Sequence, residues 1–206
     1  MTSPLTHVAS RGQQTRAAIL THAGLLATRI GLVGVTIGRL ANDLEMSKSG
    51  LFAHFASKED LQLRTLDNER DRFIEAVVRP ALQKPGGAPR VREVFERWII
   101  WRAARPGGCF FAAASFELDD RPGPVRERLA QTQREWLDAL ARMAEGAVSR
   151  GHFQPGIDAA AWAFELYGIM LSYHIAEQLL RDPEARSRLE RAFGDLMERS
   201  QAGLHG

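Results

Sequence analysis

The sequence has a single cysteine, Cys109, and no long apolar run. One cysteine cannot form an intrachain disulfide, and it excludes a zinc site built on several cysteines. No uncharged apolar run approaches the roughly 20 residues of a membrane span, and the N-terminus lacks the apolar core of a signal peptide. We therefore expect a protein of the cytoplasm that has no membrane partner.

Catalytic motifs are also missing. The chain contains no GxGxxG, P-loop, HExxH or GxSxG pattern. His174 and Glu177 stand three residues apart, a spacing that could place two metal ligands on one helix, but no second such pair appears. We therefore expect no enzyme activity, no cofactor and no metal site. A helical enzyme that binds a metal or a cofactor remains the alternative.

Charge is spread unevenly along a nearly neutral chain. The net charge of the 206 residues is +2, yet residues 1–66 carry seven Lys and Arg against four Asp and Glu, a balance of +3 that leaves −1 for the rest. A basic N-terminal part on a near-neutral body is typical of a protein that binds a polyanion. Apolar residues make up 45%, enough to build a core.

Helical periodicity covers nearly the whole chain, and alternating β-branched runs are absent, so we predict an all-α fold. Thr36, Ser47 and Ser57 each stand where an N-cap would begin a helix. A long helix should follow Ser57 and end before Pro80, because proline interrupts helix hydrogen bonding. The other expected helices cover residues 13–31, 90–104, 109–117, 125–150 and 158–181, and a last one begins near residue 183.

Residues 35–61 form a candidate helix-turn-helix. In that motif the second helix lies in the major groove, so it needs an apolar inner face and a small or polar outer face. Leu51 and Phe55, four residues apart, would face inward. The outer face would then carry Lys48, Ser49 and Phe52, with His54 placed more obliquely. A plain helical bundle remains open on this pattern alone.

The segments TRAAIL (15–20) and VTIGRLANDLEMSKSGLFAHFASKEDL (35–61) resemble the signature of the tetracycline-repressor (TetR) family of bacterial transcription regulators. The resemblance implies a helix-turn-helix DNA-binding domain at 1–57 and a helical effector-binding and dimerisation domain at 58–206, with helix 58–78 connecting them. It implies a homodimer that binds double-stranded operator DNA, more often as a repressor released by a small-molecule effector. The DNA-binding positions carried over are Thr36, Ser47, Lys48, Ser49, Gly50, Phe52, His54 and Lys58. A partner module that has lost DNA binding is a further alternative.

Two residues depart from the family pattern. Glu45 occupies a turn position where the family usually has glycine, so either a non-glycine residue adopts a left-handed conformation or the turn differs. Phe52 stands where the family commonly has tyrosine, so a hydroxyl that could bind phosphate is lost. We therefore expect phosphate contacts to depend more on Thr36 and Lys58.

Aromatic and polar residues of the C-terminal part are candidates for an effector pocket and a dimer interface. Glu117, beside Asp119 and Asp120, is interpreted either as a polar group of the pocket or as part of a solvated helix end. Helix 158–181 is apolar on more than one face, so it is either part of a dimer interface or an enclosed central helix. The resemblance favours the dimer, because the family dimerises through a four-helix bundle of this kind. The predicted pocket residues are Trp98, Trp101, Phe111, Ser115, Trp136, Tyr167 and His174. The predicted interface residues are Trp162, Leu166, Ile169, Tyr173, Leu189, Phe193 and Leu196.

Overall fold

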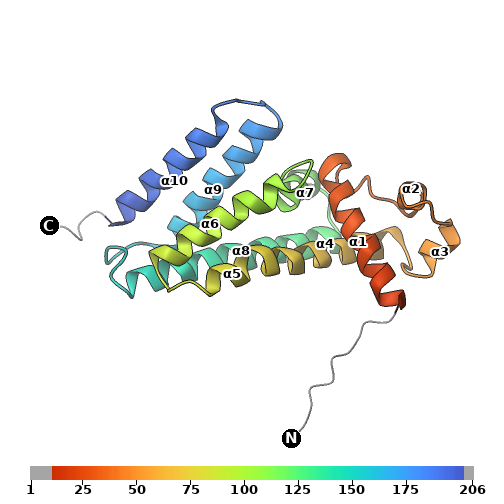
Figure 1. The fold of residues 1–206 in the computed structure, drawn as a ribbon, viewed down its shortest axis with the longest axis horizontal. Helices are drawn as coiled ribbons and strands as arrows, with labels where there is room; N and C mark the ends of the chain where they lie inside the picture. The colour runs from red at the N-terminus through yellow and green to blue at the C-terminus, as the bar shows by residue number, and fades with distance from the viewer. Residues whose placement is uncertain (1–10, 202–206) are drawn as a thin grey trace, which may run out of the picture.

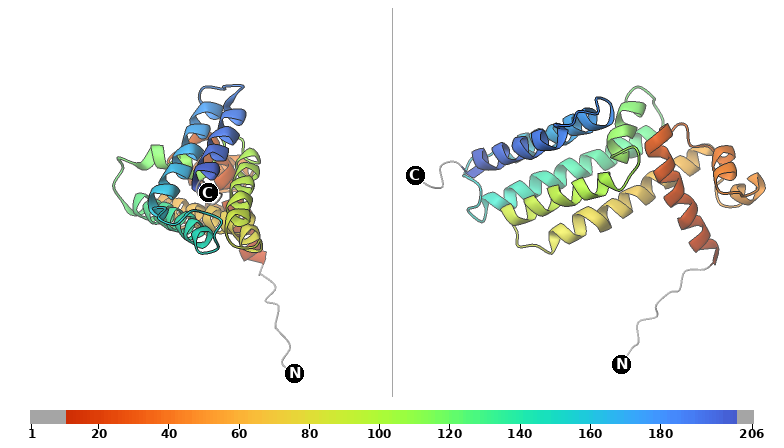
Figure 2. Two further views of the ribbon diagram at one scale, coloured as in Figure 1. Left: turned by 90° about the vertical axis from the view of Figure 1, so that its left-hand side faces the viewer. Right: turned by 45° about the horizontal axis from the view of Figure 1, so that its top comes forward.

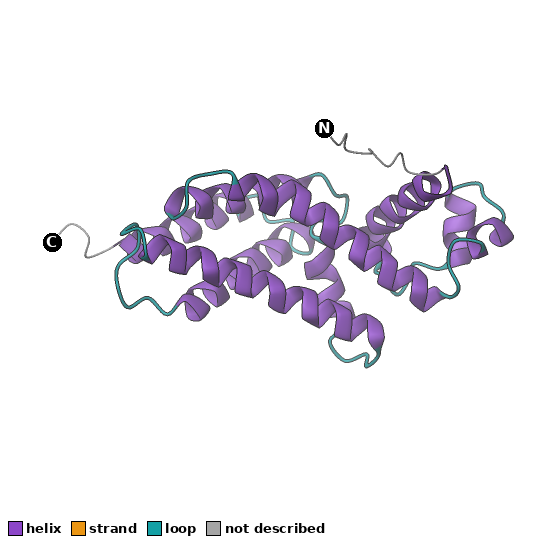
Figure 3. Cartoon of the chain, turned by 90° about the horizontal axis from the view of Figure 1, so that it is seen from below, coloured by secondary structure: helices purple, strands orange, loops and turns teal. Residues whose placement is uncertain are grey.

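The computed structural model describes residues 11–201, which form helices joined by turns and loops, with no strand within that range (Figure 3). This confirms the all-α prediction for these residues. Residues 1–10 and 202–206 of the two expected domains lie outside the described range. The helices are α1 (Arg11–Ile30), α2 (Ile37–Asp43), α3 (Lys48–Phe52), α4 (Lys58–Phe73), η1 (Ile74–Val78), α5 (Arg79–Leu82), α6 (Ala88–Ala103), α7 (Phe110–Leu118), α8 (Pro124–Val148), α9 (Ala159–Gln178) and α10 (Ala185–Gln201).

Residues 11–57, which we call the head, lie at one end of the molecule, and residues 58–201 form the body (Figure 1). The three predicted N-caps are confirmed. The Thr36 hydroxyl accepts from the N–H of Arg39 at 3.1 Å, and the Ser47 hydroxyl accepts from that of Gly50 at 3.0 Å. Ser57 begins α4 in the same way. Each cap satisfies a backbone donor that has no partner inside its own helix, so the helix start is fixed locally.

The turn between α2 and α3 has the left-handed conformation that we considered for Glu45. Its φ is 53°, and the next N–H, of Met46, donates to the carbonyl of Ala41 at 2.9 Å. The backbone thus makes the turn that glycine usually makes, with a side chain in place.

The rod α4–η1–α5 corrects one prediction, because the helical path does not end before Pro80. Residues 74–78 form a π-helical turn, in which the N–H of Arg79 donates to the carbonyl of Ile74. Pro80 then stands in the first turn of α5, where the N–H that proline lacks is not needed. The wider turn lets the rod pass the proline and end at Leu82.

In the body, α6 and α8 run beside the rod, and α9 and α10 form an antiparallel pair that covers them (Figures 1 and 2). The ring of Phe95 in α6 stacks on that of Phe193 in α10, with centroids 3.7 Å apart. The indole N–H of Trp162 in α9 donates to the Ser200 hydroxyl of α10 at 2.9 Å. These buried contacts hold α10 against α6 and α9, although α6 is far from α10 in the sequence.

The same burial corrects the predicted dimer interface. Six of the seven residues face the interior of this single chain, because the periodic stripes that identified them are the stripes that pack into the body's own core. These six are Trp162, Leu166, Tyr173, Leu189, Phe193 and Leu196. Ile169 is half-buried. The outward face of α9 instead carries Phe164 and Leu179, which are 75% and 73% exposed.

Side chains from two body helices hold one head residue, Leu32, and we call this arrangement the Leu32 clamp. From α7, the Glu117 carboxylate accepts from the N–H of Leu32 at 2.6 Å and from that of Val33 at 3.1 Å. From α4, the amide of Gln62 donates to the carbonyl of Leu32 at 2.9 Å. Glu117 is therefore not part of a solvated helix end. Its carboxylate ties α7 to the turn that follows α1.

A buried carboxylate makes a second connection between head and body. Glu69 of α4 has no exposed surface, and it pairs with Arg72 at 2.8 Å and with Arg105 at 3.0 Å. It lies directly against α1, since a Cβ on Gly24 would stand 2.4 Å from its carboxylate oxygen. A side chain at position 24 would clash with the Glu69 carboxylate, so glycine at this position leaves room for the ion pairs of Glu69.

Candidate DNA-contacting face and effector cavity

The outer face of α3 is exposed and the inner face is buried, as the helix-turn-helix interpretation requires. Leu51 and Phe55 are 0% and 1% exposed and pack into the head. Lys48 and Ser49 are exposed, and the ring of Phe52 is 56% exposed although it is a large apolar group. α3 lies at the end of the molecule, away from α10, so nothing in the described chain covers this face (Figures 1 and 2).

The predicted DNA-binding residues lie together around α3. Thr36, Ser47 and Lys58 stand at the starts of α2, α3 and α4, and Lys58 is exposed. A hydroxyl that accepts a backbone N–H keeps its own O–H, so Thr36 and Ser47 remain able to donate to a phosphate oxygen. His54 is half-buried, its ring 6.2 Å from that of Phe55.

Gly50 has a structural role within the head itself. A Cβ at this position would stand 3.1 Å from the Ser47 hydroxyl oxygen, which is closer than ordinary van der Waals contact. Glycine therefore leaves room for the capping hydroxyl. It also keeps α3 free of a side chain at this point, so its backbone could approach a DNA surface closely.

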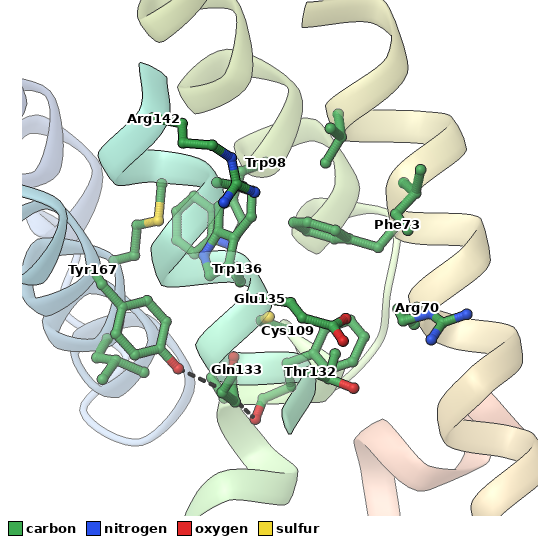
Figure 4. A pocket seen from close by; sticks show the side chains of 17 residues that line it. Arg70, Phe73, Trp98, Cys109, Thr132, Gln133, Glu135, Trp136, Arg142 and Tyr167 are labelled. Atoms are coloured by element: carbon green, nitrogen blue, oxygen red, sulfur yellow. Dashed lines mark hydrogen bonds between the residues drawn. The ribbon is translucent and has the colours of Figure 1, made fainter. Parts of the chain in front are cut away.

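A cavity of about 240 Å³, which we call the effector cavity, lies among the body helices α4, α7, α8 and α9 (Figure 4). The ring of Phe73 meets those of Phe111 and Trp136 edge to face, with centroids 5.7 and 4.9 Å apart. The other apolar lining residues are Ile74, Val78, Trp98, Cys109, Ala112, Ala139, Met170 and Leu171. The polar ones are Arg70, Thr132, Gln133, Glu135, Arg142 and Tyr167. A mostly aromatic wall with a few polar groups is typical of a site for a small organic molecule.

Hydrogen bonds fix the polar groups at one end of the cavity. The amide of Gln133 donates to the hydroxyl of Tyr167 at 2.7 Å (Figure 4). It also donates to the hydroxyl of Ser115 at 2.7 Å. Ser115 in turn donates to the carbonyl of Phe111. Burial raises the pKa of Tyr167 to about 12, so its phenol stays neutral at physiological pH. This end can therefore orient a polar group of a ligand without contributing charge.

Four of the seven predicted pocket residues line the effector cavity: Trp98, Phe111, Trp136 and Tyr167. Ser115 stands behind the wall, bonded to Gln133. The structure places Trp101 and His174 elsewhere. Trp101 lies under the guanidinium of Arg105, 3.0 Å from the ring centroid, and so belongs to the Glu69 network. His174 is buried in α9, where burial and the nearby charge of Arg102 lower its pKa.

The sequence interpretation missed the contribution of α4 to the cavity and, apart from Trp136, that of α8. Helix 58–78 was interpreted only as a connection, yet Arg70 and Phe73 of α4 form one wall. From α8 come Thr132, Gln133 and Arg142. A signal was present, because Phe73 stands seven residues after the buried Leu66 and continues its apolar stripe through a charged helix.

Between residues 11 and 201, no three His, Cys, Asp or Glu side chains are grouped so that they could hold a metal ion. Over the same range, no helix has the length and apolar character needed to cross a membrane. Cys109 is buried at the cavity wall, and burial raises the pKa of its thiol, so the unreactive protonated form dominates at physiological pH.

Solved structures of TetR-family regulators have the same fold. A regulator from Agrobacterium tumefaciens superposes with a TM-score of 0.79 at 19% identity, covering 92% of this chain and 99% of that one. One from Chloroflexus aurantiacus gives 0.75 at 24% identity, covering 91% and 94%. AibR in complex with isovaleryl coenzyme A and operator DNA gives 0.68 at 22% identity, covering 90% and 98%.

Sequence comparison identifies the C-terminal part. No curated protein matches the chain. The family model for the tetracyclin repressor-like C-terminal domain matches residues 87–193, which is just over half of the chain and includes α6 to α9 and part of α10. The head has the signature segments at 15–20 and 35–61, and the body has both the matching domain and the matching fold. The chain therefore belongs to the TetR family.

Proposed function

We propose that the protein is a sequence-specific DNA-binding transcriptional regulator. The observation that supports this most directly is the exposed face of α3, where Lys48, Ser49 and Phe52 project beside the capped starts of α2 and α4. Side chains at base edges supply specificity, while the hydroxyls and Lys58 anchor phosphates. The chain's charge is consistent with this assignment, since the surplus of basic residues lies within residues 1–66.

The test is a mobility-shift titration with a duplex from the promoter region of the protein's own gene, repeated at rising salt. Phosphate contacts release counterions, so affinity should fall steeply as salt increases. Replacing Lys48 with alanine should weaken binding, by about 1–3 kcal/mol if Lys48 contacts a base. Lys84→Ala is the matched control, because Lys84 lies in the body and pairs with Glu93 at 3.5 Å.

Two results would contradict the proposal. Absence of any shift at low salt would favour a helical partner module or an enzyme on the same fold. Equal affinities of the Lys48 and Lys84 variants would remove α3 from the DNA interface, even if the protein binds DNA.

We further propose that the protein acts as a homodimer through the outward face of α9. Phe164, Gly168, Ser172 and Ile175 of α9 and Leu179 just after it stand on one stripe, at helical spacing of three and four residues. A Cβ at Gly168 would meet no atom within 4 Å, so a second helix can approach the backbone there. A second copy is the occupant that best fits, since isologous contact brings two such faces together and pairs two heads for a palindromic operator.

Light scattering after size-exclusion chromatography tests the dimer. Phe164→Glu should yield monomers, because a carboxylate would be buried without a partner in the interface. Phe116→Glu is the control, as Phe116 is 53% exposed but lies on α7. A Phe164→Glu protein that elutes as a dimer would place the interface on another face.

An effector in the cavity, we propose, changes the DNA affinity of the head and so releases a repressor. The structure of AibR, which has the same fold, contains both isovaleryl coenzyme A and operator DNA. This supports the proposal that one such chain binds both a small molecule and DNA. The coupling element would be the Leu32 clamp. α7 contributes Phe111 to the cavity and Glu117 to the clamp, while α4 contributes Phe73 and Gln62. An effector that prefers one spacing of α4 and α7 thereby biases the position of the head.

A further inference from the structure

A second cavity adjoins the effector cavity along α8. It has a volume of about 230 Å³, and it shares Val78, Ala139 and Arg142 with the effector cavity. α8 lines the first cavity from Thr132 to Arg142 and the second from Ala139 to Gly146, and Arg150, just after the end of α8, also lines the second. The two cavities therefore lie next to each other along roughly 21 Å of α8.

The second cavity, which we call the arginine cavity, is lined by three arginines and no acidic residue. Arg142 makes no ion pair or hydrogen bond within residues 11–201. Arg150 donates only to the carbonyl of Gly146 at 3.0 Å. Arg90 donates to two backbone carbonyls through one nitrogen, and its Nε is buried without a partner.

Arg142 and Arg150 are exposed, so solvent partly screens their charges, but three guanidinium groups around one cavity still produce a positive potential that favours an anion. Buried donors without partners are costly, so the Arg90 Nε also favours a bound acceptor. A guanidinium group can donate two parallel hydrogen bonds to two oxygens of a carboxylate or of a phosphate. Figure 4 shows Arg142 beside the indole of Trp136, at the opposite end of the effector cavity from Gln133 and Thr132. Arg142 thus lies at the boundary between the largely apolar effector cavity and the arginine cavity.

We propose that the effector is an amphipathic organic anion, and this rests on the proposed role of the cavity as an effector site. The apolar part of the ligand lies against Phe73, Trp98 and Trp136, and its carboxylate or phosphate is held by Arg142 with Arg90 and Arg150. Arg142 sets the length of the apolar part, because it is the only arginine that lines both cavities within the described chain.

An organic cation is the opposing candidate, since Glu135 lines the effector cavity. Its carboxylate, however, already accepts from the amide of Gln131 at 3.0 Å, and the guanidinium of Arg70 lines the same cavity. The Glu135 carboxylate therefore already has a hydrogen-bond donor and a nearby arginine, whereas no acidic residue lines the arginine cavity. This difference favours the anion.

The experiment titrates the full-length protein with four eight-carbon probes: octanoate, octyl phosphate, 1-octanol and octylamine. Tryptophan fluorescence reports binding, because Trp98 and Trp136 line the cavity. Octanoate and octyl phosphate should bind about tenfold or more tightly than 1-octanol, the size of effect expected of hydrogen bonds to charged groups. A preference for one of the two anions identifies the head group.

Variants locate the charge recognition. Arg142→Gln and Arg150→Gln should each reduce octanoate affinity toward that of 1-octanol, and should reduce it by a larger factor than the affinity for 1-octanol. Binding of 1-octanol by a variant shows that the variant is folded. Arg134→Gln is the matched control, since Arg134 lies on α8, is exposed and lines neither cavity. Equal affinity for all probes, a preference for octylamine, no binding of any probe, or no effect of the two variants would overturn the proposal.

Failure of this inference is separable from failure of the proposed function. A promoter duplex is titrated against the same protein without probe. If the duplex binds and the anion preference is absent, the ligand class is wrong and the regulator assignment stands. If no duplex binds, the regulator assignment fails whatever the probes show.

Discussion

The head and the body place their helices by different means. Between residues 36 and 58, each helix begins with a Thr or Ser hydroxyl that accepts a backbone N–H. In the body, Asp158 caps α9, but α6, α7 and α8 begin without any side-chain cap, and buried rings hold helices that are distant in sequence. The head is therefore specified over a few residues at a time, and the body by packing. Substitutions at the junction between head and body should change the free energy of unfolding most, and substitutions that alter a local turn conformation should change it least.

The largest effect is expected where a charge of the body is buried against the head. Glu69→Ala should lower the free energy of unfolding by about 3–5 kcal/mol, because it leaves Arg105, itself 6% exposed, without its ionic partner. Urea denaturation followed by circular dichroism measures this.

Glu75→Ala is the matched control on the same rod. Glu75 pairs with Arg79, but both side chains are about 60% exposed, at 59% and 63%, so the loss should stay below about 1 kcal/mol. Similar losses for the two variants would mean that burial of the Glu69 network does not distinguish the junction from the surface.

A smaller loss of stability is expected from a substitution in the Leu32 clamp, together with a weaker effect of the effector on DNA affinity. Glu117→Gln removes the charge and one of the two acceptor oxygens that receive the N–H groups of Leu32 and Val33. The free energy of unfolding should fall by about 1–3 kcal/mol. The change in DNA affinity caused by an effector should shrink, because α7 would no longer hold the head firmly. Promoter-shift titrations with and without effector measure that ratio.

Asp119→Asn serves as the control for the clamp, since Asp119 is exposed two residues farther along. If the effector response of Glu117→Gln equals that of the unsubstituted protein, communication runs through α4 alone.

The comparison of the two regions also explains what the sequence could predict. Thr36 and Ser47 were assigned correctly, and the left-handed conformation of Glu45 was one of the two alternatives considered, because a cap or a left-handed turn depends on residues within three or four positions. Leu51 and Phe55 followed from their spacing alone.

The same reasoning failed in the body because periodicity shows that a face is apolar but not what covers it. Leu166 and Phe193 were placed on the outside of the body, yet they lie in its core. Glu117 could not be assigned, since its partners Leu32 and Val33 are more than 80 residues away in the sequence. Four aromatic residues of the cavity were found because their size and density mark a core or a pocket, and its arginines were missed because they resemble a solvated surface.

The smallest effect is expected from local backbone strain, and here the two regions should behave alike. Glu45 in the head and Arg181 after α9 are the non-glycine residues with positive φ in the described chain, at 53° and 50°. A residue with a Cβ costs about 1–2 kcal/mol in the left-handed conformation. Glycine avoids this cost, but the greater entropy of its unfolded state offsets part of the gain in stability. Glu45→Gly and Arg181→Gly should therefore each stabilise the protein by up to about 1 kcal/mol, or roughly 2–4 °C in Tm. Thermal denaturation compares them directly. A gain at Arg181 with a loss at Glu45 would show that the Glu45 side chain makes a stabilising contribution in the head, and the contrast between local and packed regions would then extend to the turn as well.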